Sequence, residues 1–179
     1  MRTLVGSAGA VMLVLTGGCA MSQGETSQKD GSANVGAVAM LRTAAGLDVG
    51  RAVAIAEGDR IRVKIEGKAM PVGVHGAHVH TTGRCDAPDF ASAGPHWNPT
   101  GAQHGTQNPA GAHAGDLPNL TVAADGTGTL SMMLPAGSLD AMLDADGAAM
   151  VIHATADDLR TDPSGNSGGR IACGVFQRG

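Results

Sequence analysis

Short runs of alternating apolar and polar residues dominate the chain from about residue 33 onward. In the clearest run, residues 61–65, the isoleucines and the valine share one face of a strand, because successive strand residues point to opposite sides. Glycines and Asp-Gly pairs separate the runs at the spacing of β-hairpins. The pattern predicts eight strands, near residues 35–41, 51–56, 61–65, 75–81, 120–122, 130–132, 149–154 and 171–176.

These strands predict an all-β protein, an eight-stranded antiparallel Greek-key β-sandwich or barrel. Only residues 138–143 show a helical pattern. Two long segments, residues 82–116 and 155–170, lack any strand pattern, and loops of that length inside a domain are usually functional. We therefore expect the chemistry of the protein to lie in these two loops.

The amino terminus has the features of an export signal. Arg2 precedes an apolar run from Leu4 to Leu15, which is too short to span a membrane and has the length of the apolar part of a signal peptide. The run ends in Leu15-Thr16-Gly17-Gly18-Cys19, which resembles a lipoprotein signal with Cys19 as the lipidated residue. Because Thr16 departs from that pattern, ordinary cleavage nearby is the alternative. We predict a periplasmic or cell-envelope protein that meets a membrane only through a lipid anchor at Cys19.

Three parts are expected along the chain. Residues 1–19 form the signal peptide, of the lipoprotein type; a core helix is the alternative, disfavoured by the polar tract that follows. Residues 20–32 have too few apolar side chains to fold, which predicts a flexible tether. Residues 33–179 form one domain, whose core must be aliphatic because aromatic residues make up 2% of the chain. The formal net charge of −4 provides no basic patch, so we expect no nucleic-acid partner.

All seven histidines lie between residues 75 and 153, and core packing does not explain such clustering. His78 and His80 are two residues apart, so on a strand both imidazoles project from one face and can bind one ion. Two solvated histidines on an open sheet face are the alternative for this pair alone. Four further residues with metal-binding side chains follow along one loop: His96, His104, His113 and Asp116. Three nitrogen donors and one carboxylate can close a tetrahedral zinc site.

Several separated motifs together resemble those of a known family. They are His75-Gly-Ala-His78-Val-His80, Ser92-Ala-Gly-Pro-His96-Trp-Asn-Pro, His113-Ala-Gly-Asp116-Leu and Gly169-Arg170-Ile-Ala-Cys173-Gly-Val. In order and spacing they resemble copper/zinc superoxide dismutases of the bacterial exported type, from about Val35 to the end of the chain. The resemblance implies an oxidoreductase that uses copper and zinc to convert superoxide to oxygen and hydrogen peroxide, protecting the cell envelope from external superoxide.

The resemblance also assigns roles residue by residue. It implies that copper is bound by His78, His80, His96 and His153, and zinc by His96, His104, His113 and Asp116. His96 is then shared by the two metals, and His75 is a structural histidine. Asp157 resembles a carboxylate that binds one ligand of each metal, with a solvated loop aspartate as the alternative. Cys85 and Cys173 match an intrasubunit disulfide, with two free buried thiols as the alternative.

Arg170 and His96 carry the catalytic roles that the resemblance implies. Arg170 would attract and hold the superoxide anion beside copper, whereas a surface arginine is its alternative. His96 would release copper and take up a proton during the cycle. Ala77 replaces an aromatic residue of many relatives, and residues 155–169 contain no lysine, so the turnover rate stays open.

Two other functions fit parts of the sequence. An envelope protein that stores or delivers copper or zinc needs the same ligands but no turnover. A structural adhesion-type sandwich with incidental histidines fits the strand pattern. Monomer and homodimer are both compatible with the sequence, and it does not identify the source of copper.

Overall fold

The computed structural model describes Thr3 and residues 35–179. The predicted signal peptide, the lipidation site Cys19 and the predicted tether therefore lie outside the described residues, apart from Thr3. Strands β1 (Val35–Arg42), β2 (Asp48–Glu57) and β3 (Arg60–Gly67) pair as an antiparallel meander. Each extends beyond its predicted range, because backbone pairing continues into polar residues that apolar alternation does not mark.

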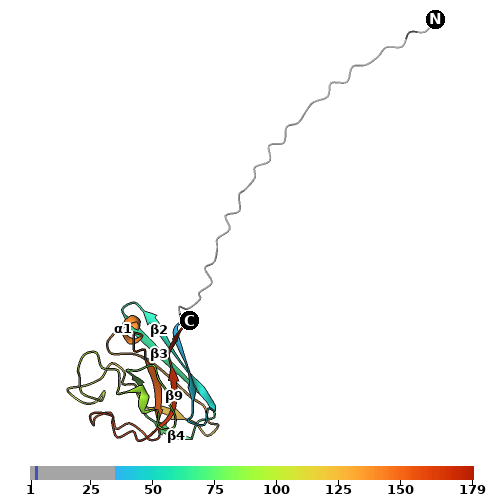
Figure 1. The fold of residues 1–179 in the computed structure, drawn as a ribbon. Helices are drawn as coiled ribbons and strands as arrows, with labels where there is room; N and C mark the ends of the chain where they lie inside the picture. The colour runs from blue at the N-terminus through green and yellow to red at the C-terminus, as the bar shows by residue number, and fades with distance from the viewer. Residues whose placement is uncertain (1–2, 4–34) are drawn as a thin grey trace. The chain divides into compact units, whose positions relative to one another are not determined.

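The main sheet has the strand order β5-β8-β9-β1-β2-β3-β7, and β10 also pairs with β1 (Figure 1). Its remaining strands are β5 (Ala77–His80), β7 (Gly128–Met133), β8 (Ala149–His153), β9 (Arg170–Val175) and β10 (Gln177–Arg178). Its strand pairs are antiparallel. The late strand β9 returns to lie beside β1, as a Greek key requires. The predicted all-β antiparallel class is confirmed.

The prediction of one strand over residues 75–81 is wrong. Strand β4 (Gly73–His75) pairs with β6 (Leu120–Val122) in a separate two-stranded sheet, whereas β5 pairs with β8. The chain changes sheet at Gly76, whose N–H donates to the Thr155 carbonyl at 2.8 Å. A Cβ there would lie only 2.8 Å from the Cβ of Ser167, so the crossing needs a glycine. The break separates His75 from His78 and His80.

Two short helices lie between the strands. Helix α1 (Leu139–Met142) confirms the expected helical segment; Ser138 caps it by accepting a hydrogen bond from the Ala141 N–H at 3.3 Å. The 3-10 helix η1 (Ala91–Ala93) lies in the first long loop and was not predicted. No helix in the described part of the chain is long and apolar enough to cross a membrane.

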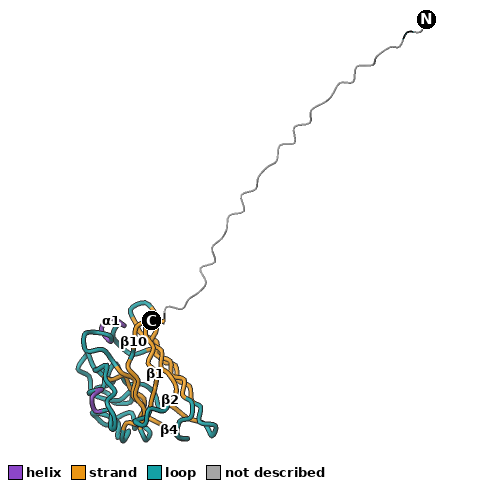
Figure 2. The backbone as a smooth tube through the Cα atoms, turned by 45° about the vertical axis from the view of Figure 1, so that its right-hand side comes forward, coloured by secondary structure: helices purple, strands orange, loops and turns teal. Residues whose placement is uncertain are grey.

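The core is aliphatic, as the composition predicts. The apolar side chains of the residue 61–65 run are buried and its polar ones are not, which matches the alternation. Strands and long loops gather on different sides of the domain (Figure 2). The two long loops contact each other: the Gln107 N–H donates to the Leu159 carbonyl at 2.9 Å. This contact holds the two loops beside each other.

Candidate metal centre

The first long loop docks on strand β5 through backbone hydrogen bonds. Val79 donates its N–H to the Gly115 carbonyl at 2.9 Å and accepts from the Trp97 N–H at 2.8 Å. A Cβ at Gly115 would collide with the Val79 carbonyl, so the close approach needs a glycine. The docking places loop residues opposite strand residues in two isolated bridges, His80 with His96 and His78 with Asp116. Candidate metal-binding residues that are distant in sequence are thereby brought together.

A first group of four buried histidines converges at β5 and the end of β8. It consists of His78, His80, His96 and His153, whose ligand atoms all lie within 4.8 Å of one another. Burial lowers the pKa of His78 to about 3 and that of His153 to about 4, and it also lowers the pKa of His80 and of His96. These imidazoles are therefore neutral at neutral pH, the form that binds metals.

The hydrogen-bonding state of these rings fits a metal. Among the described residues, the buried side-chain polar atoms without a hydrogen-bond partner are all imidazole nitrogens: His78 Nδ1, His80 Nε2, His104 Nδ1 and His153 Nε2. Leaving a buried polar atom unpaired costs about 1–3 kcal/mol, so four of them in one region need an explanation. Metal ions bound by these nitrogens provide it.

The opposite nitrogens of the first group are held by acceptors, which fixes the tautomers. The contacts are His78 Nε2 with Asp157 Oδ2 at 2.6 Å, His80 Nδ1 with the Gly94 carbonyl at 2.8 Å, and His153 Nδ1 with the Gly168 carbonyl at 3.2 Å. A proton on each of these nitrogens leaves the lone pair on the other one. Those lone pairs are the unsatisfied atoms of the group.

A second group lies around Asp116. The contacts are His96 Nδ1 with Asp116 Oδ1 at 2.9 Å, His113 Nδ1 with Asp116 Oδ1 at 3.2 Å and with His96 Nδ1 at 3.4 Å, and His104 Nδ1 with Asp116 Oδ2 at 3.1 Å. The last pair lacks hydrogen-bond geometry, since His104 Nδ1 is unsatisfied. Ligands about 2.0 Å from a tetrahedral zinc are about 3.3 Å apart, so these four donors fit zinc. His96 Nδ1 belongs to this group, which leaves its Nε2 to the first.

By the 4.8 Å criterion the fourth member of the second group is His78 rather than His113, because the ligand atoms of His78, His96, His104 and Asp116 all lie within that distance of one another. We prefer His113 as the fourth donor. Its Nδ1 lies within 3.4 Å of both His96 Nδ1 and Asp116 Oδ1, which is shorter than the 4.8 Å limit by which His78 is included.

Asp157 lies between the two groups and is buried. Its carboxylate contacts His78 Nε2 at 2.6 Å and His104 Nε2 at 3.1 Å. Burial alone would raise the pKa of Asp157, but hydrogen bonds from His104 and His78 outweigh it and lower the pKa, so the group is ionised. For the His104 imidazole the signs are reversed. Burial lowers its pKa, but the neighbouring carboxylates of Asp116 and Asp157 outweigh burial and raise the pKa to about 9. Asp157 therefore contacts one histidine of each group.

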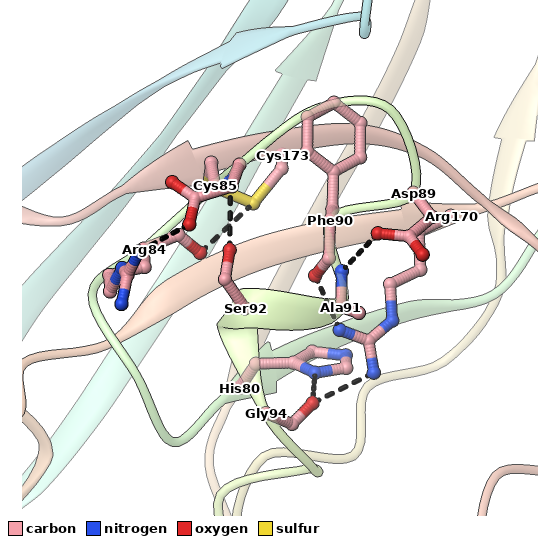
Figure 3. The surroundings of a disulfide bond; sticks show 11 residues. His80, Arg84, Cys85, Asp89, Phe90, Ala91, Ser92, Gly94, Arg170 and Cys173 are labelled. Atoms are coloured by element: carbon pink, nitrogen blue, oxygen red, sulfur yellow. Dashed lines mark hydrogen bonds and ion pairs between the residues drawn. A yellow bond between two sulfur atoms is a disulfide. The ribbon is translucent and has the colours of Figure 1, made fainter.

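Arg170 and three histidines of the first group line one cavity. The cavity measures about 410 Å³ and is lined by His80, His96, His153 and Arg170, among others. Arg170 donates to the Phe90 carbonyl at 2.6 Å and to the Gly94 carbonyl at 2.8 Å (Figure 3). A larger cavity of about 700 Å³ lies over the disulfide, but no histidine lines it. We therefore take the smaller cavity as the candidate active site.

The structure joins Cys85 and Cys173 in a disulfide (Figure 3). The bond links the first long loop to β9, the strand that begins with Arg170. His75 is buried apart from both groups. Its Nδ1 contacts the His153 carbonyl at 2.8 Å and its Nε2 the Pro71 carbonyl at 2.9 Å, so it ties the end of β8 to the segment before β4.

Sequence reasoning missed several residues that position the site. Asn119 holds Asp157 by both ends of its amide: its Oδ1 accepts from the Asp157 N–H at 2.7 Å, and its Nδ2 donates to the Asp157 carbonyl at 2.8 Å. The Gly94 carbonyl serves both His80 and Arg170. Asp162 accepts from the His104 N–H at 2.6 Å. No motif marks these residues, because the contacts join distant segments.

The fold and these two groups define an all-β protein with two adjacent candidate metal sites, and His96 belongs to both. Residues 48–176 match the family description "Copper/zinc superoxide dismutase". The chain is 42% identical over 149 residues to a Cu-Zn superoxide dismutase of Caulobacter vibrioides, covering 79% of this chain and 85% of that one. This chain belongs to the copper/zinc superoxide dismutase family. It is accordingly an oxidoreductase with superoxide as substrate and with copper and zinc as cofactors.

Solved structures agree with this placement. A superoxide dismutase-like protein from Bacillus subtilis aligns with a TM-score of 0.72 at 41% identity, covering 78% of this chain and 97% of that one. The Cu/Zn superoxide dismutase from Brucella abortus aligns with a TM-score of 0.63 at 27% identity, covering 78% and 98%. The sandwich or barrel fold expected from the sequence is therefore shared with these proteins.

Proposed function

We propose that this protein converts superoxide to oxygen and hydrogen peroxide in the cell envelope, where it protects the cell from external superoxide. The observation that carries this proposal is the set of unsatisfied buried imidazole nitrogens beside a cavity that also holds Arg170. An exported location is supported by the apolar run from Leu4 to Leu15 and by Cys19 as a lipid anchor. The Cys85–Cys173 disulfide suits an oxidising compartment.

The proposed metal assignment follows the two groups. Copper is held by His78, His80, His96 and His153, and zinc by His96, His104, His113 and Asp116. When bound, copper supplies one-electron redox chemistry, whereas zinc has no redox chemistry and holds the shared ring and the loop in place.

The residues of the chain guide the substrate and move a proton. The net charge of −4 would repel an anion, so a local cation is needed, and Arg170 provides it in the wall of the cavity. Its guanidinium is oriented by the Phe90 and Gly94 carbonyls. His96 uses Nδ1 in the zinc group, so its Nε2 is the atom that can hold a proton and pass it to the substrate. Asp157 keeps His78 and His104 in their ligand orientations.

Turnover by the purified protein tests the proposal. The protein is stripped with a chelator and reloaded with copper and zinc, and the decay of superoxide is followed while both metals are quantified. Fast decay that depends on copper supports dismutation. Full loading without turnover would instead support a copper- and zinc-binding envelope protein, a candidate kept because a relative of solved structure is named only as superoxide dismutase-like.

Arg170→Ala is expected to lower kcat/KM for superoxide about tenfold, at the low end of the 10- to 1000-fold range of electrostatic steering. Copper and zinc contents should stay unchanged, because Arg170 provides no metal-binding atom to either group. The rate should also lose most of its dependence on ionic strength, measured between low and high salt. Arg170→Lys keeps the charge and should recover part of the rate. Loss of copper in Arg170→Ala would show that Arg170 is needed for the ligand geometry and would contradict the guiding role.

Asp116→Ala is expected to remove zinc while copper still binds. The substitution deletes one donor and leaves the Gly105 and His113 N–H groups without their acceptor, so residues 82–116 should also exchange amide hydrogens faster. Metal analysis and hydrogen exchange measure the two effects. Asp158→Asn is the matched control, because Asp158 accepts hydrogen bonds within the second loop only. Unchanged zinc stoichiometry in Asp116→Ala would defeat the zinc assignment.

A further inference from the structure

We infer that Asp162 is a second outer carboxylate of the zinc site, meaning one that binds the zinc ligands rather than zinc. It orients His104 and His113 and so acts as a positioning residue. The inference rests on the zinc assignment of the proposed function, and it concerns a residue to which neither the motifs nor the family resemblance gives a role.

The first observation is an accounting of the ligand rings. Five imidazoles bind a single metal in the proposed assignment, and four of them have an acceptor at the nitrogen turned away from that metal. These contacts are His78 and His104 with Asp157, His80 with the Gly94 carbonyl, and His153 with the Gly168 carbonyl. Such acceptors fix the tautomer and the ring plane of a metal ligand. The fifth ring, His113, is the exception.

The second observation is the position of Asp162 relative to His113. His113 Nδ1 faces His96 and Asp116, and within residues 35–179 its Nε2 forms no hydrogen bond with the protein. Asp162 Oδ1 lies 3.8 Å from that Nε2. This is an ion-pair distance and longer than a hydrogen bond, so the carboxylate acts on the ring through its charge or through a bridging water. It is thus placed to do for His113 what Asp157 does for His104.

The third observation is that the same carboxylate oxygen holds the other zinc histidine. Asp162 Oδ1 accepts the backbone N–H of His104 at 2.6 Å, a short contact of the charge-assisted type. The side chain of Asp162 is 49% exposed, so burial does not force it into this position. One oxygen therefore addresses two zinc ligands of the first loop from the second loop.

This arrangement links zinc to the wall of the active-site cavity. Pro163 and Ser164, which follow Asp162 directly, line the cavity with Arg170. Asp157 and Asp162 both come from the second loop, so zinc binding by the first loop holds the second loop at two points. Gly165 allows this approach, because a Cβ there would collide with the Asp157 carboxylate.

Zinc affinity of the full-length protein tests the inference. Asp162→Ala is expected to raise the zinc dissociation constant 10- to 100-fold, the usual cost of losing an outer partner, with copper affinity unchanged. Asp162→Asn keeps an acceptor for the His104 N–H but loses the charge that faces His113, and it should raise the constant about tenfold. Competition with a chelator of known affinity measures each constant.

A spectroscopic readout separates ligand positioning from loop stability. With Co²⁺ in place of zinc, Asp162→Asn should shift the visible absorption bands of the ion. Asp158→Asn, which loses the charge and the acceptor of the Asn166 amide inside the same loop, should not. If Asp116→Ala loses zinc but both Asp162 variants keep zinc dissociation constants within twofold of the wild-type value, the inference about Asp162 is overturned and the zinc assignment stands. Retention of zinc by Asp116→Ala would overturn the zinc assignment itself, and this inference with it.

Discussion

His80→Ala is expected to lose copper and at least about 100-fold of superoxide turnover. Losing a partner of a metal ligand already costs 10- to 100-fold in metal affinity or activity, and His80 is proposed as a ligand itself. Its Nε2 is unsatisfied and its Nδ1 is fixed by the Gly94 carbonyl at 2.8 Å, so no other side chain of the group can replace it. Zinc should remain, because His80 provides no donor atom to the second group. Copper content, the electron paramagnetic resonance spectrum of Cu²⁺ and turnover measure the effect.

His75→Ala is the matched control for His80→Ala. It removes another buried imidazole from the same region, but one whose nitrogens both contact backbone carbonyls. We expect it to lower stability and to keep copper. A His80→Ala protein that retains both copper and turnover would show that the first group is not the copper site.

Most strands could be predicted because their side chains alternate between a buried and an exposed face. The residue 61–65 run is the clearest case, and its apolar members are buried as expected. The strand over residues 75–81 could not be predicted correctly, since its pattern continues through Gly76 while the backbone changes sheets there. That change depends on contacts with Thr155 and Ser167, which are about 80 and about 90 residues away in sequence.

The sequence offers candidates for the metal-binding residues and, through the family resemblance, for the orienting carboxylate Asp157, but it does not mark the other residues that orient the candidate ligands. The HxH pair is visible in the sequence, and the clustering of the other histidines in the same part of the chain makes a metal site the better interpretation. A backbone carbonyl such as that of Gly94 has no sequence signature, although it holds both His80 and Arg170. Asn119 and Asp162 look like ordinary polar loop residues, and only the folded loops show that they contact Asp157 and His104.

The Gly94 carbonyl also connects the disulfide to the active site. Cys85 and Gly94 belong to the same loop segment, and Arg170 begins the strand that contains Cys173 (Figure 3). The disulfide therefore fixes both partners of the Arg170 hydrogen bonds, the carbonyls on the loop and the guanidinium on the strand. Without the bond, these carbonyls should be less well fixed relative to β9, while the histidines of β5 and β8 stay in the sheet.

Replacing both Cys85 and Cys173 by serine is expected to lower the free energy of unfolding of the metal-free protein by about 4–5 kcal/mol. The bond closes a loop between residues 88 apart, and the entropy that such a crosslink removes from the unfolded chain has about that value. Denaturant unfolding of the metal-free wild-type and variant proteins measures the difference.

The reloaded double-serine variant should keep its copper but lose the part of its turnover that depends on Arg170. Adding Arg170→Ala should therefore lower the rate of this variant less than it lowers the wild-type rate. A loss of stability below about 1 kcal/mol would contradict the expected effect of the crosslink. A full Arg170 effect in the double-serine variant would contradict the coupling between the disulfide and Arg170.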